Sequence, residues 1–161
     1  MQKIVPNLWY DKEAEEAAKF YVSIFPNSKI TKVTHYGKAG YDIHKMPEGT
    51  VLTVEFQLDG QDFLGLNGGP LFKFNEAVSF IVNCETQEEV DELWDKLSAD
   101  PASEQCGWLK DKYGLSWQIV PTALNELLES KDTEKSNRAM EAMLQMKKLD
   151  ITKLKQAYEG S

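Results

Sequence analysis

The chain has 161 residues, with 26 acidic side chains against 18 basic ones and a formal net charge of −8. This charge repels phosphate backbones, so we expect no nucleic-acid partner. No run of about 18 apolar residues occurs, and the first residues lack the apolar stretch of a signal peptide, so we expect neither a membrane span nor export. Cys84 and Cys106 form no disulfide or ligand pattern, which predicts a reducing, cytoplasmic setting.

The first half of the chain predicts the order strand, helix, strand, strand, strand. Residues 4–10 read as a strand, and Asp11 is expected to cap a helix over residues 14–25, because its carboxylate can accept hydrogen bonds from the free amides of a first turn. The stretches "NSKITKVTHYG" and "TVLTVEFQL" alternate apolar and polar residues as strands do. The Asp-Gly pair at 59–60 predicts a tight hairpin into a last strand, "QDFLGLN".

The second half predicts the same order again. "AVSFIVNC" is typical of a strand, and Thr86 with Glu89 predicts a capping box at the start of the next helix. Short extended pieces around "SEQ" and "GWLKD" precede the strand "SWQIVP". The repeat favours two duplicated βαβββ modules, residues 3–70 and 75–121, within one domain over residues 1–121, although helices and hairpins also alternate by chance in α+β domains.

Residues 122–161 predict a C-terminal helical extension. Charged residues are dense there, and no strand pattern remains. Asp150 is the expected N-cap of the last helix, with Leu149 and Leu154 placed to form a hydrophobic staple across it. Met140 and Met143 give an earlier helix an apolar face that is more typical of core than of a binding groove.

Several long stretches together identify a family resemblance. They are "LWYDKEAEEAAKFYVSIFPNSKI", "VLTVEFQLDGQDFLGLNGGP", "FKFNEAVSFIVNCETQEEVDELWDKLS", "CGWLKDKYGLSWQIVP" and "AMEAMLQMKKLDI". From Lys3 to about Ile151 the chain resembles the PhnB-like proteins, a branch of the vicinal oxygen chelate superfamily of glyoxalases, bleomycin-resistance proteins and dioxygenases, often labelled 3-demethylubiquinone-9 3-methyltransferase-like. The resemblance implies an α+β fold of two paired βαβββ modules that form a cupped mixed sheet, within a homodimer.

The resemblance also implies positions for a divalent metal. In glyoxalase-type relatives His, Gln and Glu ligands lie on the inner sheet face, and the matching positions here are Val5, Leu64 or Gly65, Val78 and Gln118. Only Gln118 has a donor atom, and one amide oxygen cannot hold a transition metal that needs three or four ligands. We therefore expect no metal and no cofactor, with a metal-dependent lyase or dioxygenase as the alternative.

A small-molecule pocket is the favoured interpretation of this sheet face. Asn7 and Trp9 share a strand face with Val5, and aromatic and amide side chains together are typical of small-molecule sites. The predicted ligand is a small, partly aromatic or apolar molecule, which the protein would sequester or process without a metal. The predicted ligand-binding residues are Asn7, Trp9, Asn67, Phe72, Trp108 and Gln118, although Trp9, Trp108 and Gln118 are also compatible with plain core positions.

Two residues are weak candidates for catalysis. Glu55 is an acid inside a strand, where burial would raise its pKa, but an exposed strand face explains it equally well. Cys106 has no activating base placed nearby by the sequence.

The histidines give still weaker evidence for a functional site. His35 and His44 are nine residues apart across a Gly-containing stretch, and residues 37–49 predict a polar loop able to close over a site. Two histidines at that separation fix no metal geometry.

Methyl transfer from S-adenosylmethionine usually needs a glycine-rich turn after the first strand, and the Gly pair at 68–69 lies elsewhere, so the methyltransferase label is disfavoured.

Overall fold

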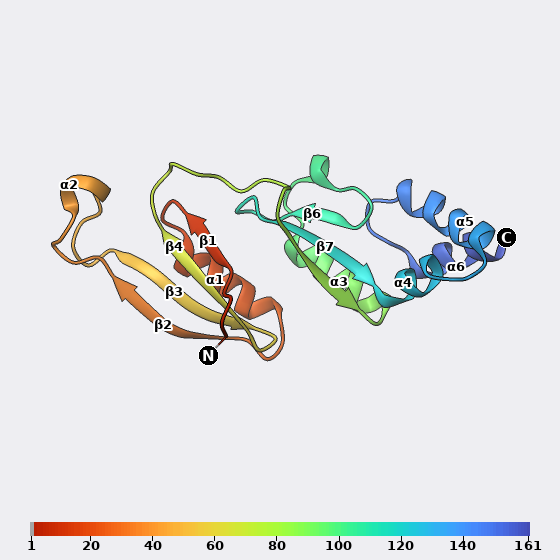
Figure 1. Cartoon of the computed structure of the whole chain (residues 1–161), viewed down its shortest axis with the longest axis horizontal. Helices are drawn as coiled ribbons and strands as arrows, with labels where there is room; N and C mark the ends of the chain where they lie inside the picture. The colour runs from red at the N-terminus through yellow and green to blue at the C-terminus, as the bar shows by residue number, and fades with distance from the viewer. Residues whose placement is uncertain (1) are drawn as a thin grey trace. The chain divides into compact units, whose positions relative to one another are not determined.

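The computed structural model describes residues 2–161, which divide into one compact unit ending at Phe74 and a second beginning at Asn75 (Figure 1). Each unit contains an open sheet covered by a helix on one face, and the first sheet has four strands whereas the second has three. The predicted α+β fold class is therefore confirmed. Within the described residues no helix combines the length and the apolar character needed to cross a membrane.

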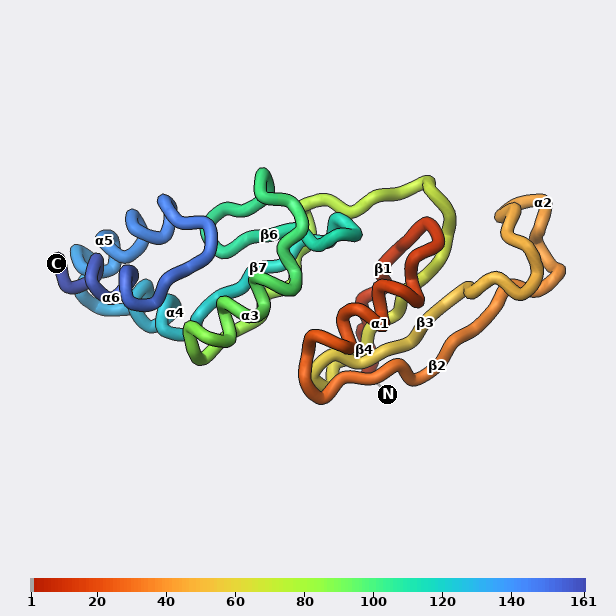
Figure 2. Tube along the Cα trace, turned by 180° about the vertical axis from the view of Figure 1, so that it is seen from behind, coloured from red at the N-terminus to blue at the C-terminus, as the bar shows by residue number. Residues whose placement is uncertain are grey.

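The first unit is a four-stranded sheet in the order β1-β4-β3-β2. Strands β1 and β4 are parallel and the other pairs are antiparallel. Helix α1 packs along one face, as Figures 1 and 2 show, over the buried side chains of Val54, Phe56 and Phe63. The elements are β1 (Asn7–Tyr10), α1 (Ala14–Ile24), β2 (Lys29–His35), α2 (Tyr41–His44), β3 (Val51–Leu58) and β4 (Gln61–Asn67).

The predicted hairpin between β3 and β4 is confirmed. Leu58 pairs with Gln61, so Asp59 and Gly60 alone make the turn. Both have positive φ, 49° and 79°, as a two-residue turn of this kind requires. The Asp-Gly pair thus sets the register of the two central strands.

The predicted cap of α1 is wrong. The helix begins at Ala14, where it was expected, but the residue preceding it is Glu13 instead of Asp11, and Glu13 makes no capping hydrogen bond through its side chain. Instead the Ala14 amide donates to Oδ1 of Asn67 at 2.9 Å, so the cap comes from the end of β4. Nδ2 of the same buried side chain donates to the Val51 carbonyl at 3.1 Å.

We expect Asn67→Ala to lower the free energy of unfolding by about 2 kcal/mol, because it removes a helix cap and leaves a buried amide without its acceptor. Urea denaturation followed by circular dichroism measures the loss. Asn75→Ala is the matched control, since Asn75 accepts a similar backbone hydrogen bond from Ala77 on an exposed turn. Equal stability of the two variants would contradict the capping role.

The predicted loop at residues 37–49 contains the short helix α2. Its base is closed by two backbone hydrogen bonds, from the Tyr36 amide to Thr50 and from the Gly49 amide to Tyr36. His44 packs on the Tyr36 ring, and its two nitrogens bond the Met46 amide and the Ala39 carbonyl. The imidazole therefore stabilises the conformation of this loop.

The second unit is a three-stranded sheet in the order β5-β7-β6, with β5 parallel to β7. Helix α3 covers one face. The fourth strand expected around residues 103–105 is wrong: the chain forms a 3-10 turn, η1, and a single bridge between Gln105 and Trp108. Pro101, which has no amide hydrogen, begins that turn. The elements are β5 (Ser79–Cys84), α3 (Gln87–Leu97), η1 (Pro101–Ser103), β6 (Trp108–Lys110) and β7 (Ser116–Pro121).

The predicted cap of α3 is confirmed. Oγ1 of Thr86 accepts from the Glu89 amide at 3.2 Å. The Glu89 carboxylate reaches back to the amide of Glu85, one residue before the cap, instead of to Thr86 itself. Two free donors at the helix start are satisfied in this way.

The C-terminal residues fold as three helices in the second unit, α4 (Thr122–Leu128), α5 (Thr133–Leu144) and α6 (Ile151–Glu159). The Asp150 side chain caps α6 by accepting from the Lys153 amide, as predicted. Leu149 and Leu154 are both fully buried and share a core cluster with Leu124, which confirms the expected staple. The helices thus have an apolar core of their own.

Cys84 and Cys106 are both free thiols. Cys84 is fully buried, and burial raises the pKa of its thiol to about 12, with a smaller contribution from the Glu89 carboxylate. Cys106 is half-buried. The two thiols should therefore differ in reactivity, since only a thiolate that reagents can reach reacts quickly.

At about pH 8 we expect dithionitrobenzoate to modify Cys106 quickly and Cys84 only on unfolding. An unfolded thiol ionises near pH 8.5, whereas Cys84 stays protonated in the folded protein up to about pH 12, so stability should fall as pH rises through this interval. A Cys106→Ser variant isolates the slow thiol for both measurements. Rapid modification of Cys84 in this variant would contradict the expectation.

Candidate functional site

The sheet of the second unit leaves one face uncovered by α3. Strand residues alternate between the two faces, so Trp117 and Ile119 are buried, whereas Gln118 between them lies on the other face. The strand register places Gln118 between Ile81 of β5 and Trp108 of β6. A glutamine within this apolar strand therefore belongs to the open side of the sheet.

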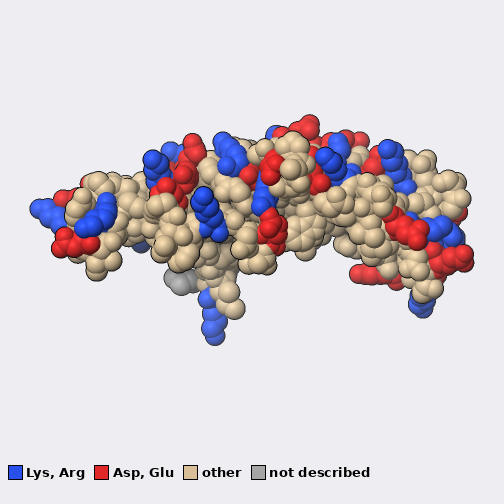
Figure 3. Space-filling view, turned by 90° about the horizontal axis from the view of Figure 1, so that it is seen from above, with Lys and Arg blue, Asp and Glu red and all other residues tan. Residues whose placement is uncertain are grey.

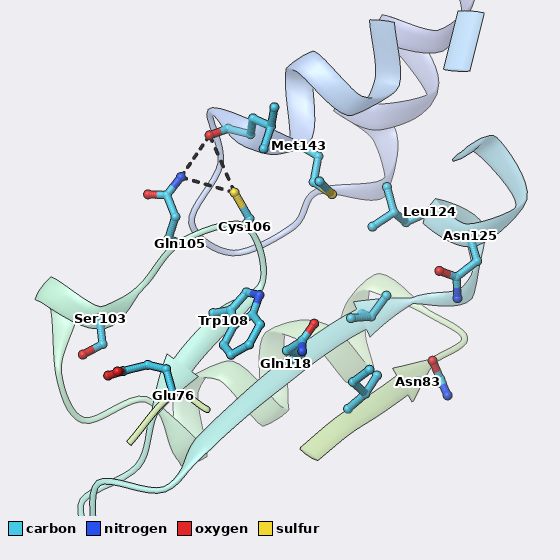
Figure 4. A pocket seen from close by; sticks show the side chains of 13 residues that line it. Glu76, Asn83, Ser103, Gln105, Cys106, Trp108, Gln118, Leu124, Asn125 and Met143 are labelled. Atoms are coloured by element: carbon cyan, nitrogen blue, oxygen red, sulfur yellow. Dashed lines mark hydrogen bonds between the residues drawn. The ribbon is translucent and has the colours of Figure 1, made fainter. Parts of the chain in front are cut away.

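A pocket of about 840 Å³ lies over this open face (Figure 4). The sheet forms its floor, and α4, α5 and the chain before β6 form its walls. Figure 4 shows Trp108 and Gln118 side by side on the sheet, with Leu124 and Met143 facing them from the helices. The lining residues are Glu76, Ile81, Asn83, Ser103, Gln105, Cys106, Trp108, Gln118, Val120, Leu124, Asn125, Met143 and Leu144.

Gln118 has unused hydrogen-bonding capacity in the pocket. Its Nε2 donates to Oγ of Ser79 at 3.0 Å, which orients the amide. Among the described residues, no donor bonds Oε1, and the second hydrogen on Nε2 has no acceptor. One acceptor and one donor therefore remain available on a half-buried side chain.

The wall before β6 is fixed by backbone hydrogen bonds to the chain after α5. The amides of Cys106 and Gly107 donate to the carbonyls of Met146 and Lys147, both at 2.8 Å. Gly107 has a φ of 86°, and a Cβ there would meet the Leu149 side chain at 3.0 Å and the Ile119 carbonyl at 3.1 Å. Glycine is needed where the two segments approach so closely.

Charge at the pocket is confined to one side chain, Glu76. Its carboxylate forms an ion pair with Lys110 of β6. The hydrogen bond from Lys110 holds the pKa of Glu76 below its usual value, so this acid is ionised near neutral pH. The rest of the lining is apolar or neutral.

Cys106, a weak catalytic candidate, lines the pocket. Its sulfur accepts from Nε2 of Gln105 at 3.3 Å and lies 3.7 Å from the Leu144 carbonyl. Neither contact is with a base that would remove the thiol proton. A catalytic role for Cys106 stays a prediction without an activating group beside it.

The other predicted ligand residues lie in the first unit. Asn7 is exposed on the sheet face away from α1, and Trp9 follows on the same face. The Trp9 ring contacts the edge of Phe72 at a centroid distance of 4.9 Å, and its Nε1 donates to the Gly69 carbonyl at 2.9 Å. Asn67 uses both ends of its amide for the α1 cap and the Val51 carbonyl. A ligand contact by these four residues stays a prediction.

Glu55, the other catalytic candidate, is exposed on the face of β3 away from α1. It pairs in register with Leu64 on one side and Lys32 on the other. No other candidate catalytic residue pairs with it there, and a catalytic role for Glu55 stays a prediction.

No group of three or more His, Cys, Asp or Glu side chains within residues 2–161 is placed to hold a metal. Of the positions implied by the family resemblance, Leu64 lies on the open face of its sheet, whereas Gly65 faces Ala14 of α1. Val5 and Val78 are exposed. His35, at the end of β2, and His44, at the end of α2, make no common site, because both ring nitrogens of His44 are bonded within the α2 loop.

Sequence reasoning missed the part of the pocket that comes from the C-terminal helices. Leu124, Asn125 and Leu144 were expected only as parts of a helical extension. The apolar face that includes Met143 was a signal, but its spacing alone does not distinguish core from pocket wall.

Comparison with known proteins gives a consistent result. A family described as 3-demethylubiquinone-9 3-methyltransferase matches residues 2–120. A solved structure of a putative 3-demethylubiquinone-9 3-methyltransferase, a PhnB protein from Bacillus cereus, is 38% identical with a TM-score of 0.62, covering 74% of this chain and 99% of that one. A Pseudomonas aeruginosa protein shares the fold at 14% identity and a TM-score of 0.51, covering 75% and 98%. No curated protein matches this chain.

Proposed function

This chain belongs to the PhnB-like proteins of the vicinal oxygen chelate superfamily, the family described as 3-demethylubiquinone-9 3-methyltransferase, and from that premise we propose that it binds a small, largely apolar molecule in the pocket of its second unit without a metal. The observation that carries the proposal is Gln118. Its amide has a free acceptor and a free donor inside a pocket lined mainly by hydrocarbon. A few directed polar groups among apolar walls are typical of small-molecule sites.

The apolar part of the pocket supplies most of the proposed affinity. Trp108 lies beside Gln118 on the sheet, and Leu124 and Met143 face them from the helices. Displacing water from such side chains contributes roughly 25 cal/mol for each Å² of apolar area that the ligand covers. The amide contributes orientation. A polar ligand group that lost its hydrogen bonds to water without pairing with the amide would be destabilised, so the ligand turns that group toward Gln118.

Methyl transfer, the activity in the family description, has weaker support. The Gly pair at 68–69 serves the packing of Trp9: a Cβ on Gly68 would lie 2.3 Å from that ring, and the Gly69 carbonyl accepts from its Nε1. Both glycines therefore serve the packing and hydrogen bonding of Trp9 within the first unit. A glycine-rich turn that cradles a nucleotide needs free backbone amides pointing at the ligand.

A cytoplasmic homodimer is part of the same proposal. Large apolar side chains are exposed in both units, among them Leu71 at 74%, Phe72 at 58% and Val78 at 63%. Exposed apolar area of this kind favours association with another protein surface. Acidic and basic side chains alternate on the face shown in Figure 3, with no broad region of one sign.

The binding proposal predicts a defined response to a neutral fluorescent ligand, N-phenylnaphthylamine. Wild-type protein should bind it saturably, and Trp108→Ala should weaken binding about tenfold, because the ligand loses an aromatic contact surface. Fluorescence titration measures both dissociation constants. Phe25→Ala, which removes a half-buried ring at the end of α1, should leave the constant within about twofold of wild type.

Two results would count against the proposal. One is the absence of saturable binding by folded wild-type protein. The other is equal affinity of wild type and Trp108→Ala, since the dye would then bind elsewhere. Thermal melting of each variant shows whether the second unit is still folded.

A further inference from the structure

We infer that the pocket selects an uncharged, planar ligand that carries a hydrogen-bond donor and acceptor side by side, as in a lactam or a cyclic imide. This inference rests on the proposed function and names the ligand class for the same pocket. It depends on the charge of the lining, on the free atoms of Gln118 and on the position of Trp108.

The lining contains nothing to pair with an anionic ligand. Of the described residues that line the pocket, none is Lys, Arg or His. The nearby cation, Lys110, is already paired with Glu76. A carboxylate or phosphate entering this pocket would lose its water without gaining an opposite charge, which is strongly unfavourable.

A cationic ligand is also poorly matched. Glu76 is the one acidic lining residue, and its ionised carboxylate is bonded to Lys110. A ligand cation would have to displace Lys110 from that ion pair. The remaining polar lining groups are four carboxamides, the Ser103 hydroxyl, the Cys106 thiol and the Trp108 indole N–H, which are all uncharged and favour neutral ligands.

The free donor and acceptor of Gln118 define a hydrogen-bonding pattern that a ligand must match. Ser79 takes one hydrogen of Nε2. The inference assigns to that bond the hydrogen directed away from Oε1, so that the N–H beside Oε1 and the Oε1 acceptor both remain for a ligand. A carboxamide offers these two groups next to each other and in one plane. A matching ligand edge has an acceptor that meets the Gln118 N–H and, next to it, a donor that meets Oε1. Asn and Gln recognise adjacent donor and acceptor atoms on a base edge in the same way.

Trp108 favours a planar ring beside that edge. It is directly opposite Gln118 across the β6–β7 pair, where side chains lie roughly 5 Å apart at Cβ. A flat ligand can therefore stack on or against the indole while its edge reaches the amide (Figure 4). Asn83 and Asn125, both exposed at the far end of the pocket, add neutral donors and acceptors there.

Four compounds of similar size test the inference. They are carbostyril, a bicyclic lactam; N-methylcarbostyril, which lacks the donor; naphthalene, which lacks both polar groups; and naphthoate, which is an anion. Isothermal titration, or competition against N-phenylnaphthylamine, gives each dissociation constant. Wild-type protein should bind carbostyril about tenfold more tightly than the N-methyl compound and naphthoate.

Gln118→Leu should remove this preference while keeping an apolar pocket. Its dissociation constants for carbostyril and N-methylcarbostyril should agree within about twofold, and naphthalene should bind at least as well as to wild type. Gln57→Leu is the matched control: Gln57 is also a half-buried strand residue, and its amide bonds Asp62 in the first unit. That variant should keep the tenfold preference.

The outcomes separate the two proposals. If the neutral compounds bind with equal affinity, or naphthoate binds most tightly, the ligand class is overturned and pocket binding stands. If Gln118→Leu keeps the lactam preference, Gln118 is not the selecting residue and the inference fails. If folded wild-type protein binds none of the compounds, the proposed function itself fails.

Discussion

Replacing Asp111 with alanine is expected to lower the free energy of unfolding of the second unit by about 3 kcal/mol or more, because at least three donors lose one buried acceptor group. The Asp111 side chain is only 3% exposed. Its Oδ1 accepts from the amides of Tyr113 and Leu115 at 2.8 and 3.1 Å. Its Oδ2 accepts from Nε1 of Trp117 at 2.9 Å.

These contacts explain the size of the expected effect. The carboxylate closes the turn between β6 and β7 and joins it to a core tryptophan, so one side chain holds both the turn and the strand that carries Gln118. Each buried donor left without a partner costs about 1–3 kcal/mol, and water entering the turn would recover part of the sum.

Urea denaturation followed by circular dichroism measures this prediction. Asp100→Ala is the matched control, because Asp100 makes a similar turn with Ala102 and Ser103 but is exposed. The control should be much less destabilised. If both variants unfold at the same urea concentration, the buried network is not the source of stability that its geometry implies.

The second large effect is expected for Gly68→Ala, which should lower the stability of the first unit by about 2–4 kcal/mol. The added Cβ would lie 2.3 Å from Cζ2 and 2.4 Å from Cη2 of Trp9. If the ring moved away, it would lose the hydrogen bond from Nε1 to the Gly69 carbonyl and its contact with the Phe72 ring. Either the indole is expelled or the backbone shifts.

Scanning calorimetry and near-ultraviolet circular dichroism together measure this effect. A lower melting temperature should accompany a changed aromatic signal, since Trp9 leaves its fixed environment. Gly37→Ala is the control, because a Cβ at Gly37 meets no atom within 4 Å. If Gly68→Ala melts like the control with an unchanged aromatic spectrum, the close packing of Trp9 on Gly68 is disproved.

Features whose cause lies within a few residues were predictable from the sequence. The Asp-Gly turn at 59–60, the Thr86 cap and the Asp150 cap with its leucine staple were all confirmed. Each depends on hydrogen bonds or contacts between near neighbours, so a short motif contains all of the participants. The family resemblance extended these local patterns to the fold class.

Features that depend on distant residues were predicted less well. Asp11 has the right chemistry for a cap, but Asn67, distant in the chain, is the residue that β1–β4 pairing places at the start of α1. The strand expected near residues 103–105 needed a partner along its length, and the structure supplies only one bridge. Short-range patterns do not show which partner a backbone group will find.

The sequence by itself therefore determined most of the elements, the α+β class and the outward position of Gln118 in its strand, because strand alternation and helix periodicity are local. Only the tertiary structure decided that Trp108 lies beside Gln118 and that α4 and α5 complete the pocket. Those contacts join residues far apart in the chain, such as Cys106 and Leu144, which are 38 residues apart. Such pairs form when the whole unit buries its apolar surface, and no local pattern encodes them.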